Sequence, residues 1–311
     1  MSKKFVVTSS PHLRSGATTS NIMRDVLLAL APALAASIYY FGVRAAMMCV
    51  MCVTACMFFE FAYRKALKMP DTTGDFSAAL TGLLLAFNLP SSLPFWMALI
   101  GCFVSIVIVK QMFGGLGKNF ANPAIVGRVV LLLSFTAPMT TWPVPRGMVT
   151  AAIDAVTAPT PLASAIEVLP TYTQLFLGQI GGSLGETCKL ALLAGGIYLV
   201  FRKVITITIP LAYLGSVAVF AMLLGQDSLY HLLAGGAILG AIFMATDYVT
   251  SPTTERGKLI FGIGCGFITM VIRVFGSMPE GASFAILLMN VLTPFIDRLT
   301  TNKAFGGEKK K

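Results

Sequence analysis

The sequence contains few charged residues, only 12% of 311, whereas apolar residues make up 56% and the mean hydropathy is +0.81. A soluble domain carries about a quarter charged residues, so the composition excludes a chain surrounded mainly by water. The sequence also lacks a GxGxxG fingerprint placed between a strand and a helix, and it lacks a ferredoxin-type run of cysteines. These two absences argue against a Rossmann-type NAD site and against an iron–sulfur cubane held by this chain.

Six cysteines are present, and all of them lie in apolar segments. Three of them, Cys49, Cys52 and Cys56, share one stripe of a helix and could suggest a metal cluster. No histidine or fourth cysteine completes a ligand set nearby, and cysteine is a small residue that is readily buried. We therefore predict buried thiols and no metal site.

Apolar runs long enough to cross a hydrocarbon core of about 30 Å recur along the whole chain. Ten of them are predicted as membrane spans, at 24–41, 45–62, 76–90, 94–112, 122–138, 186–201, 204–224, 229–246, 258–275 and 282–297. These runs predict an all-α polytopic membrane protein in contact with lipid. Because the first run begins only near residue 24, no cleavable signal peptide is expected.

The net charge of +10 could indicate a nucleic-acid partner, but its distribution favours another explanation. With a cytoplasmic N-terminus and ten spans, 18 of the 23 Lys and Arg residues fall on the cytoplasmic side. The outer side or a span holds the other five: Arg44, Arg128, Arg146, Lys189 and Arg273. The positive-inside rule accounts for this surplus, so we predict cytoplasmic termini and no nucleic-acid partner.

A short motif occurs twice, at 101–114 and at 264–276. Both copies contain Gly, Cys, an aromatic residue, a cation and Phe-Gly in the same order. Two copies of five spans have opposite topologies because five is an odd number, so we predict two inverted five-helix repeats. Inverted repeats usually place a site near the membrane midplane, where broken helices expose backbone polar groups.

The spans, the charges and the repeat together predict five regions. They are a cytoplasmic N-terminal segment (1–23), a first repeat (24–138), an extracytoplasmic loop (139–185), a second repeat (186–298) and a basic cytoplasmic tail (299–311). The loop is the one long polar interval of the chain, and Arg146 is its only cation.

Polar residues occur where the predicted spans are interrupted: Asn88, Asn119, Asn122, Asp247 and Asn290. Polar groups at membrane depth are functional candidates by default. An equally good interpretation is that they cap half-helices and satisfy freed backbone carbonyls, so both interpretations stay open.

Four sequence blocks carry a resemblance to a known family. They are SSPHLRSG at 9–16, DFSAALTG at 75–82, FGGLGKNFANPA at 113–124 and ATDYVTSP at 245–252. With these blocks in order, the chain resembles the NqrB/RnfD family over nearly its whole length. The resemblance implies a urea-transporter-like fold of ten helices in two repeats. It also implies a bacterial inner-membrane subunit that carries electrons in an Rnf-type complex, which oxidises ferredoxin, reduces NAD and exports Na⁺ or H⁺.

The resemblance further implies FMN bound covalently, through its phosphate, to the last threonine of a Ser/Thr–Gly/Ala–Ala–Thr motif. Two segments compete for this role: Ser15–Thr18 matches the pattern fully, and Thr157–Thr160 departs from it at Pro159. In this family a flavin transferase adds FMN on the outer side. Residues 1–23 are predicted to be cytoplasmic, so we predict that Thr160 carries the FMN.

Asp154, Thr157 and Arg128 are candidate contacts of this flavin. Some relatives also hold a noncovalent riboflavin, for which this sequence offers no motif. The other subunits of the complex and the flavin transferase are the implied protein partners. Two alternatives to an electron carrier remain: a stand-alone channel or secondary transporter with an inverted-repeat fold, and a scaffold whose flavin site was lost through Pro159.

Overall fold

The computed structural model describes residues 18–143, 145, 157–158, 162, 170–276 and 281–301. The first half contains α1 (Thr19–Phe41), α2 (Val43–Ala66), η1 (Thr73–Asp75), α3 (Ser77–Phe87), α4 (Phe95–Phe103), the π-helical η2 (Val104–Gln111), α5 (Pro123–Ser134) and α6 (Thr136–Met139). A two-stranded antiparallel ribbon, β1 (Trp142–Pro143) and β2 (Thr157–Ala158), follows. The second half contains α7 (Tyr172–Leu177), α8 (Lys189–Phe201), α9 (Thr208–Leu223), α10 (Ser228–Leu233), α11 (Ala237–Leu239), the π-helical η3 (Gly240–Met244), α12 (Glu255–Phe275) and α13 (Ala282–Thr300).

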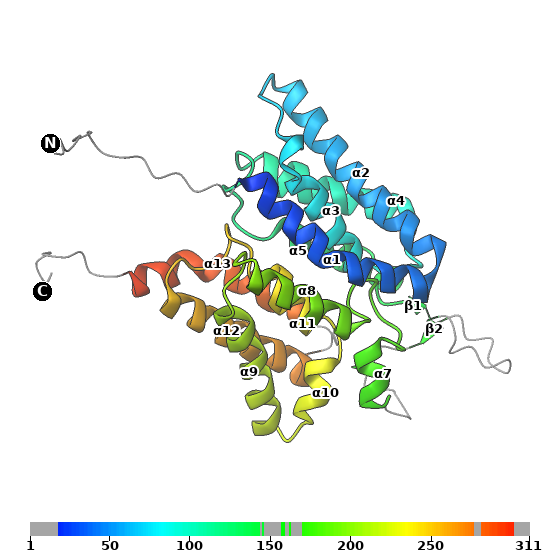
Figure 1. The fold of residues 1–311 in the computed structure, drawn as a ribbon, viewed down its shortest axis with the longest axis vertical. Helices are drawn as coiled ribbons and strands as arrows, with labels where there is room; N and C mark the ends of the chain where they lie inside the picture. The colour runs from blue at the N-terminus through cyan, green and yellow to red at the C-terminus, as the bar shows by residue number, and fades with distance from the viewer. Residues whose placement is uncertain are drawn as a thin grey trace, which may run out of the picture.

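The helices form two groups that follow the order of the chain (Figure 1). In the first group α2 packs against α3 and α4, and in the second α9 and α13 pack against α12. The groups meet where α1 packs along α8 and where α5 contacts α13. The predicted all-α polytopic class agrees with this helical architecture.

Four helices are long and apolar enough to cross a membrane: α1, α2, α12 and α13. Five shorter apolar helices lie among them, at Ser77–Phe87, Phe95–Gln111, Pro123–Ser134, Lys189–Phe201 and Thr208–Leu223. At 1.5 Å per residue the shorter helices span only about 16–26 Å, so they need adjoining non-helical segments to reach both membrane faces. The count of ten spans and the inverted repeats therefore stay predictions.

Non-helical backbone is buried where the two groups meet. The Gly185 amide donates to the Phe87 carbonyl over 2.9 Å, and the Leu184 amide donates to the Leu89 carbonyl over 3.0 Å. The Ser37 hydroxyl of α1 also donates to the Leu184 carbonyl. Backbone groups without access to water need such partners, so this pairing allows α3 to end and α8 to begin inside the protein.

Glycine allows α8 to approach α1 closely. A Cβ atom added to Gly195 would lie only 2.1 Å from the Ala29 carbonyl oxygen. Small residues at helix contacts are common in membrane proteins, because close backbone packing replaces the hydrophobic effect as a source of stability there. The contact between the two halves thus depends on the absence of a side chain at Gly195.

We expect Gly195→Ala to lower the melting temperature of the detergent-solubilised protein, because the added methyl group overlaps the Ala29 carbonyl. Gly215→Ala in α9 is the matched control, since no atom lies within 4 Å of its added Cβ. Alanine in a helix interior is otherwise favoured over glycine by about 0.5–1 kcal/mol. Equal melting temperatures for the two variants in a thermal unfolding experiment would contradict the close contact.

Candidate functional site

The loop predicted to carry the flavin is described only in part. Thr160 and Asp154 lie outside the described residues. Thr157 is described as backbone: it stands opposite Pro143 in the β1–β2 ribbon, with Trp142 opposite Ala158. Thr160, the predicted attachment residue, therefore comes two residues after Ala158, the last residue of β2.

The ribbon lies near the place where α1 ends and α2 begins (Figure 1). Trp142 is buried, and the Thr141 carbonyl before it accepts a 3.1 Å hydrogen bond from the Ser92 hydroxyl. Arg44, near the start of α2, donates to the Ser91 carbonyl over 2.7 Å and to the Ser92 carbonyl over 2.9 Å. These contacts connect β1, the 88–94 segment and α2.

Thr18, the competing threonine, lies at the opposite end of α1. Its exposed side chain caps the helix by accepting a 3.3 Å hydrogen bond from the Asn21 amide. The 23 residues of α1 rise about 34 Å at 1.5 Å per residue, which exceeds a hydrocarbon core of about 30 Å. The N-terminal threonine and the ribbon are therefore separated by one membrane-length helix.

The end of the loop is held by a contact between α7 and α10. The Tyr172 hydroxyl of α7 donates to the Asp227 carboxylate, which also accepts from the Leu229 and Tyr230 amides at the start of α10. The hydrogen bond from Tyr172 keeps the pKa of the exposed Asp227 carboxyl below its ordinary value. This contact attaches the segment after the loop to the second group of helices.

Arg128, a predicted flavin contact, lies on α5 in the interior of the protein. Its guanidinium donates to Asn88 Oδ1 over 2.7 Å and to the Ser283 hydroxyl on α13 over 2.9 Å. These bonds join the end of α3 to the start of α13. Arg128 thus links the two groups of helices, and its contact with a flavin stays a prediction.

Glu186 and Lys189 are buried beside Arg128, and the sequence analysis did not select either of them. The Lys189 ammonium donates to the Glu186 carbonyl and, over 2.9 Å, to the Gly235 carbonyl. The Glu186 carboxylate interacts electrostatically with Arg128, Lys189 and Arg273. Arg273 is partly buried, whereas the other three side chains are buried. We call these four residues the buried charge cluster. Two charged residues at the start of an otherwise apolar span were the signal that could have identified it.

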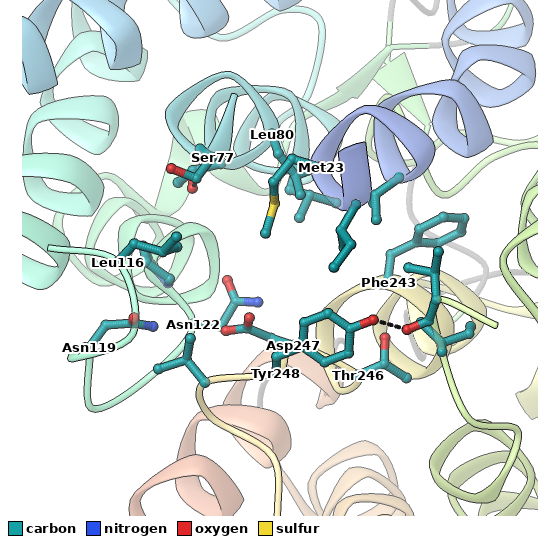
Figure 2. Close-up of a pocket in the computed structure, with 18 of the residues that line it drawn as sticks. Met23, Ser77, Leu80, Leu116, Asn119, Asn122, Phe243, Thr246, Asp247 and Tyr248 are labelled. Carbon is teal, nitrogen blue, oxygen red and sulfur yellow. Dashed lines mark hydrogen bonds between the residues drawn. The ribbon is translucent and has the colours of Figure 1, made fainter. Parts of the chain in front are cut away.

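A cavity of about 90 Å³ opens near the start of α1 (Figure 2). The start of α1 is the end of that helix that lies away from the ribbon (Figure 1). Its walls are mainly apolar and come from α1, α3, η3 and the residues that follow η3. Figure 2 shows Asn119, Asn122 and Asp247 facing one side of it. An apolar pocket with a few convergent polar groups is typical of a small-molecule site.

The asparagines of the cavity also stabilise the broken helices. Asn122 Oδ1 caps α5 by accepting from the Ala124 amide over 3.1 Å. Its Nδ2 donates to the Met244 carbonyl at the end of η3 over 3.3 Å. Asn119 bonds to the Ala121 carbonyl. Helix capping, one of the two predicted roles, therefore applies to Asn122, and its side chain also lines the cavity.

A buried ion pair adjoins the cavity. Lys110, a cavity-lining residue on η2, donates to Glu60 of α2 over 2.7 Å and to the Ser77 hydroxyl at the start of α3 over 2.6 Å. The Thr72 hydroxyl donates to the other Glu60 oxygen over 2.7 Å. Both charged side chains are almost inaccessible to solvent. Arg64, one turn along α2, lies 3.9 Å from the other Glu60 oxygen and is a second, more distant cation for this carboxylate.

All six cysteines are free thiols, and five of them are buried. Within the part of the chain that the structure describes, no three His, Cys, Asp or Glu side chains are close enough together to hold a metal ion.

Comparisons with known proteins give one consistent family. The model of the NQR2, RnfD, RnfE family matches residues 6–306. The D subunit of the Na(+)-translocating ferredoxin:NAD(+) oxidoreductase complex of Acetobacterium woodii is 48% identical, over 99% of this chain and 97% of its own. The D subunit of the proton-translocating ferredoxin:NAD(+) oxidoreductase complex of Clostridium ljungdahlii is 40% identical, over 97% and 96%. The D subunit of the ion-translocating oxidoreductase complex of Escherichia coli strain K12 / DH10B is 36% identical, over 98% and 99%.

We expect Lys110→Met to destabilise the protein by up to about 3–5 kcal/mol, because the buried Glu60 carboxylate loses its cation at 2.7 Å and keeps only Arg64, at 3.9 Å. The measurement is thermal unfolding followed with a thiol-reactive dye, since the buried cysteines become accessible on unfolding. Lys258→Met is the control: its partner Glu255 is exposed, and such surface pairs contribute about 0.2–1 kcal/mol. A Lys110→Met protein as stable as the control variant would contradict the role of the pair.

Proposed function

Because the chain belongs to the NQR2, RnfD, RnfE family, we propose that it is the RnfD-type subunit of an ion-translocating ferredoxin:NAD⁺ oxidoreductase complex. The observation that carries this function is 48% identity, over 99% of the chain, to the D subunit of such a complex. The chain acts as an electron carrier among the other subunits of the complex, and it is not catalytic alone. FMN when bound supplies the electron-transfer chemistry, while the protein sets its position and potential.

We place the FMN on Thr160, with Asp154 and Thr157 beside it. Two observations support this choice over Thr18. The Thr18 side chain is already used as the N-cap of α1. The ribbon that contains Thr157 lies at the other end of that helix (Figure 1), where the positive-inside rule puts the outer face. A flavin transferase that works on the outer side would reach the loop and not Thr18.

The ten-span arrangement in two inverted repeats is also part of the proposal. The pairs of elements support it: α4 packs between α2 and α5 in the first half, and α12 packs between α9 and α13 in the second. The two motif copies agree, because Lys110 bonds near the start of α3 and Arg273 bonds to carbonyls before α11. Lys110 and Arg273, the cations of the two motif copies, thus each bond to the segment near the start of a buried helix, α3 in the first half and α11 in the second.

The topology follows from the same arrangement. Helix α1 begins and α13 ends on the same side of the molecule (Figure 1), which suits two cytoplasmic termini in a bacterial inner membrane. The cavity near the start of α1 then faces the cytoplasm, and the ribbon faces outward. The protein therefore has one candidate redox site toward each membrane face.

The cavity is the best place for a noncovalent riboflavin. The isoalloxazine ring has apolar faces and one edge of amide-like donors and acceptors, and the cavity offers apolar walls with Asn119, Asn122 and Asp247 on one side. Carbonyl and amide side chains can satisfy such an edge. These residues would bind and orient the ring and exclude water from it.

For the covalent site, we expect the purified chain to give a fluorescent band on a denaturing gel under ultraviolet light when the flavin transferase is co-expressed. Thr160→Ala removes the only hydroxyl that the proposal uses, so the band is lost. Thr18→Ala keeps the band at full intensity. Loss of the band in Thr18→Ala alone, or no band from the unaltered chain, would refute the assignment.

For the cavity, we expect Leu80→Trp to abolish the flavin that denaturation releases from the complex, because the indole fills the space that Leu80 now borders. Leu211→Trp on the exposed face of α9 is the control and leaves the released flavin unchanged. Both variants keep the covalent band. The same amount of released flavin in Leu80→Trp and in the unaltered complex would exclude the cavity as the site.

A further inference from the structure

Lys110 places a charged group in the wall of a mainly apolar cavity. Its ammonium donates to the Glu60 carboxylate over 2.7 Å and to the Ser77 hydroxyl over 2.6 Å. Burying an ion pair costs desolvation energy, and apolar residues of similar volume are often equally stabilising or more so. Stability alone is therefore a weak reason for this pair, and its position at a cavity calls for a chemical explanation.

Hydrogen bonds continue from this pair toward the surface of the protein. The Ser77 hydroxyl, which accepts from Lys110, donates to the Asp75 carboxylate. The Thr72 hydroxyl donates to the other oxygen of Glu60 over 2.7 Å. Asp75 and Thr72 are partly exposed, whereas the three residues between them are buried. We call Lys110, Ser77 and Asp75 the relay chain, because their hydrogen bonds connect the cavity wall with the surface.

The outer end of the relay chain lies in a polar loop. Asp75 belongs to the connection between α2 and α3, in which Lys68 and Asp71 are exposed. The Ser20 hydroxyl at the start of α1 donates to the Gly74 carbonyl of this loop over 3.5 Å. Exposed lysines beside the ends of membrane helices indicate the aqueous, cytoplasmic side. Protons from water can therefore reach Asp75 directly.

The inner end of the relay chain lies at the cavity, which both Lys110 and Ser77 line. Figure 2 shows Ser77 on the α3 side of the cavity, across from Asp247 and Tyr248. A lysine ammonium has three N–H donors. Among the described residues two acceptors use them, the Glu60 carboxylate and the Ser77 hydroxyl. One donor of Lys110 therefore remains for an acceptor inside the cavity.

We propose that Lys110 is the proton donor for the reduction of a flavin in the cavity, and that Ser77 and Asp75 resupply its proton from water. The proposal rests on the proposed function, which places a flavin in this cavity. Lysine suits the role because a buried ammonium, unlike a guanidinium, can release a proton. A positioned proton donor of this kind accelerates a reaction by about 10²–10⁴-fold.

The proposed step balances in protons and electrons. Two electrons come from the preceding carrier of the complex, with ferredoxin as the ultimate donor, so the donor is oxidised and the flavin is reduced. One Nζ–H bond of Lys110 breaks, its proton passes to a ring nitrogen of the flavin, and the bonding pair stays on the neutral amine. Lys110 Nζ then regains a proton from the Ser77 hydroxyl, which is resupplied through Asp75 from water.

The ionisable groups around the relay chain come from several elements. Helix α5 carries Arg128, which bonds to Asn88 and to Ser283. The others are Glu60, Arg64 and Cys56 on α2, Cys102 on α4, Asp71 in the loop, and Asp247 and Tyr248 across the cavity. Among these described groups, Glu60 alone is hydrogen-bonded to the relay chain. Its carboxylate attracts a proton back to Lys110 Nζ after each transfer.

The test is rapid mixing of the purified whole complex with reduced ferredoxin, followed by flavin absorbance. The signal of the cavity flavin is the part that Leu80→Trp removes. Lys110→Arg keeps a cation beside Glu60, but arginine does not give up its proton in proteins. Ser77→Ala interrupts the relay chain and leaves the ion pair in place. We expect each of these two variants to slow the reduction of the cavity flavin by at least about tenfold.

Two matched controls keep the unaltered rate. Thr81→Ala removes another cavity-lining hydroxyl of α3, one that bonds to the Ser77 carbonyl and lies outside the relay chain. Asp71→Asn changes an exposed carboxylate of the same loop, whereas Asp75→Asn slows the reduction. If Lys110→Arg does not assemble, Ser77→Ala and Asp75→Asn decide.

The pH profile separates a proton relay from a structural disturbance. In Ser77→Ala the proton comes from a donor in solution, so the rate falls as the pH rises, in proportion to the proton concentration. Imidazole added to the buffer restores the rate, because its protonated form is a small proton donor. The flavin potential of Ser77→Ala is unchanged, since a relay alters the rate and not the equilibrium.

Three results overturn the proposal. Unaltered rates in Lys110→Arg and Ser77→Ala, with the released flavin lost in Leu80→Trp, refute the relay and leave the proposed function intact. Equal slowing in Ser77→Ala and Thr81→Ala indicates a disturbed cavity and refutes the relay as well. If Leu80→Trp releases as much flavin as the unaltered complex, the cavity is not the flavin site, and the relay proposal falls with it.

Discussion

Where a helix is interrupted inside a membrane protein, the freed backbone N–H and C=O groups have no water to bond to. Another segment of the protein therefore has to supply their hydrogen-bond partners. Here the segment after α3 and the segment before α8 supply them to each other, through Phe87 with Gly185 and Leu89 with Leu184. This pairing joins the two halves of the chain in the interior. It also directs the residues after Leu184 inward, and this is why Glu186 and Lys189 are buried beside Arg128.

The polar groups of the interior divide into two regions because of that arrangement. Beside the cavity, the Glu60 carboxylate pairs with Lys110 at 2.7 Å and with Arg64 at 3.9 Å. Near the start of α8, the Glu186 carboxylate interacts electrostatically with Arg128, Lys189 and Arg273. In both regions the charged side chains come from elements that are distant in the sequence, so their burial depends on how the helices pack.

The sequence predicted those features that depend on composition or on short runs of neighbouring residues. Apolar composition and four ordered blocks predicted the class and the family, and both are confirmed by the helical architecture and the match over 6–306. Capping of half-helices was one of the two interpretations left open for the polar residues at the interruptions, and it applies to Asn122. The partners of Lys110 and Arg128 could not be read from the sequence, because they lie 33–155 residues away along the chain. Such contacts form only when elements that are distant in the sequence pack against each other.

The charged side chains of the interior come from both groups of helices. Arg128 lies on α5, Lys189 on α8 and Arg273 on α12. Arg128 donates to Asn88 and to Ser283, so its hydrogen bonds reach one residue of each group. Lys189 and Arg273 donate to the carbonyls of Gly235 and Ala234, which precede α11. The charges that satisfy the interrupted backbone therefore also hold the two groups together.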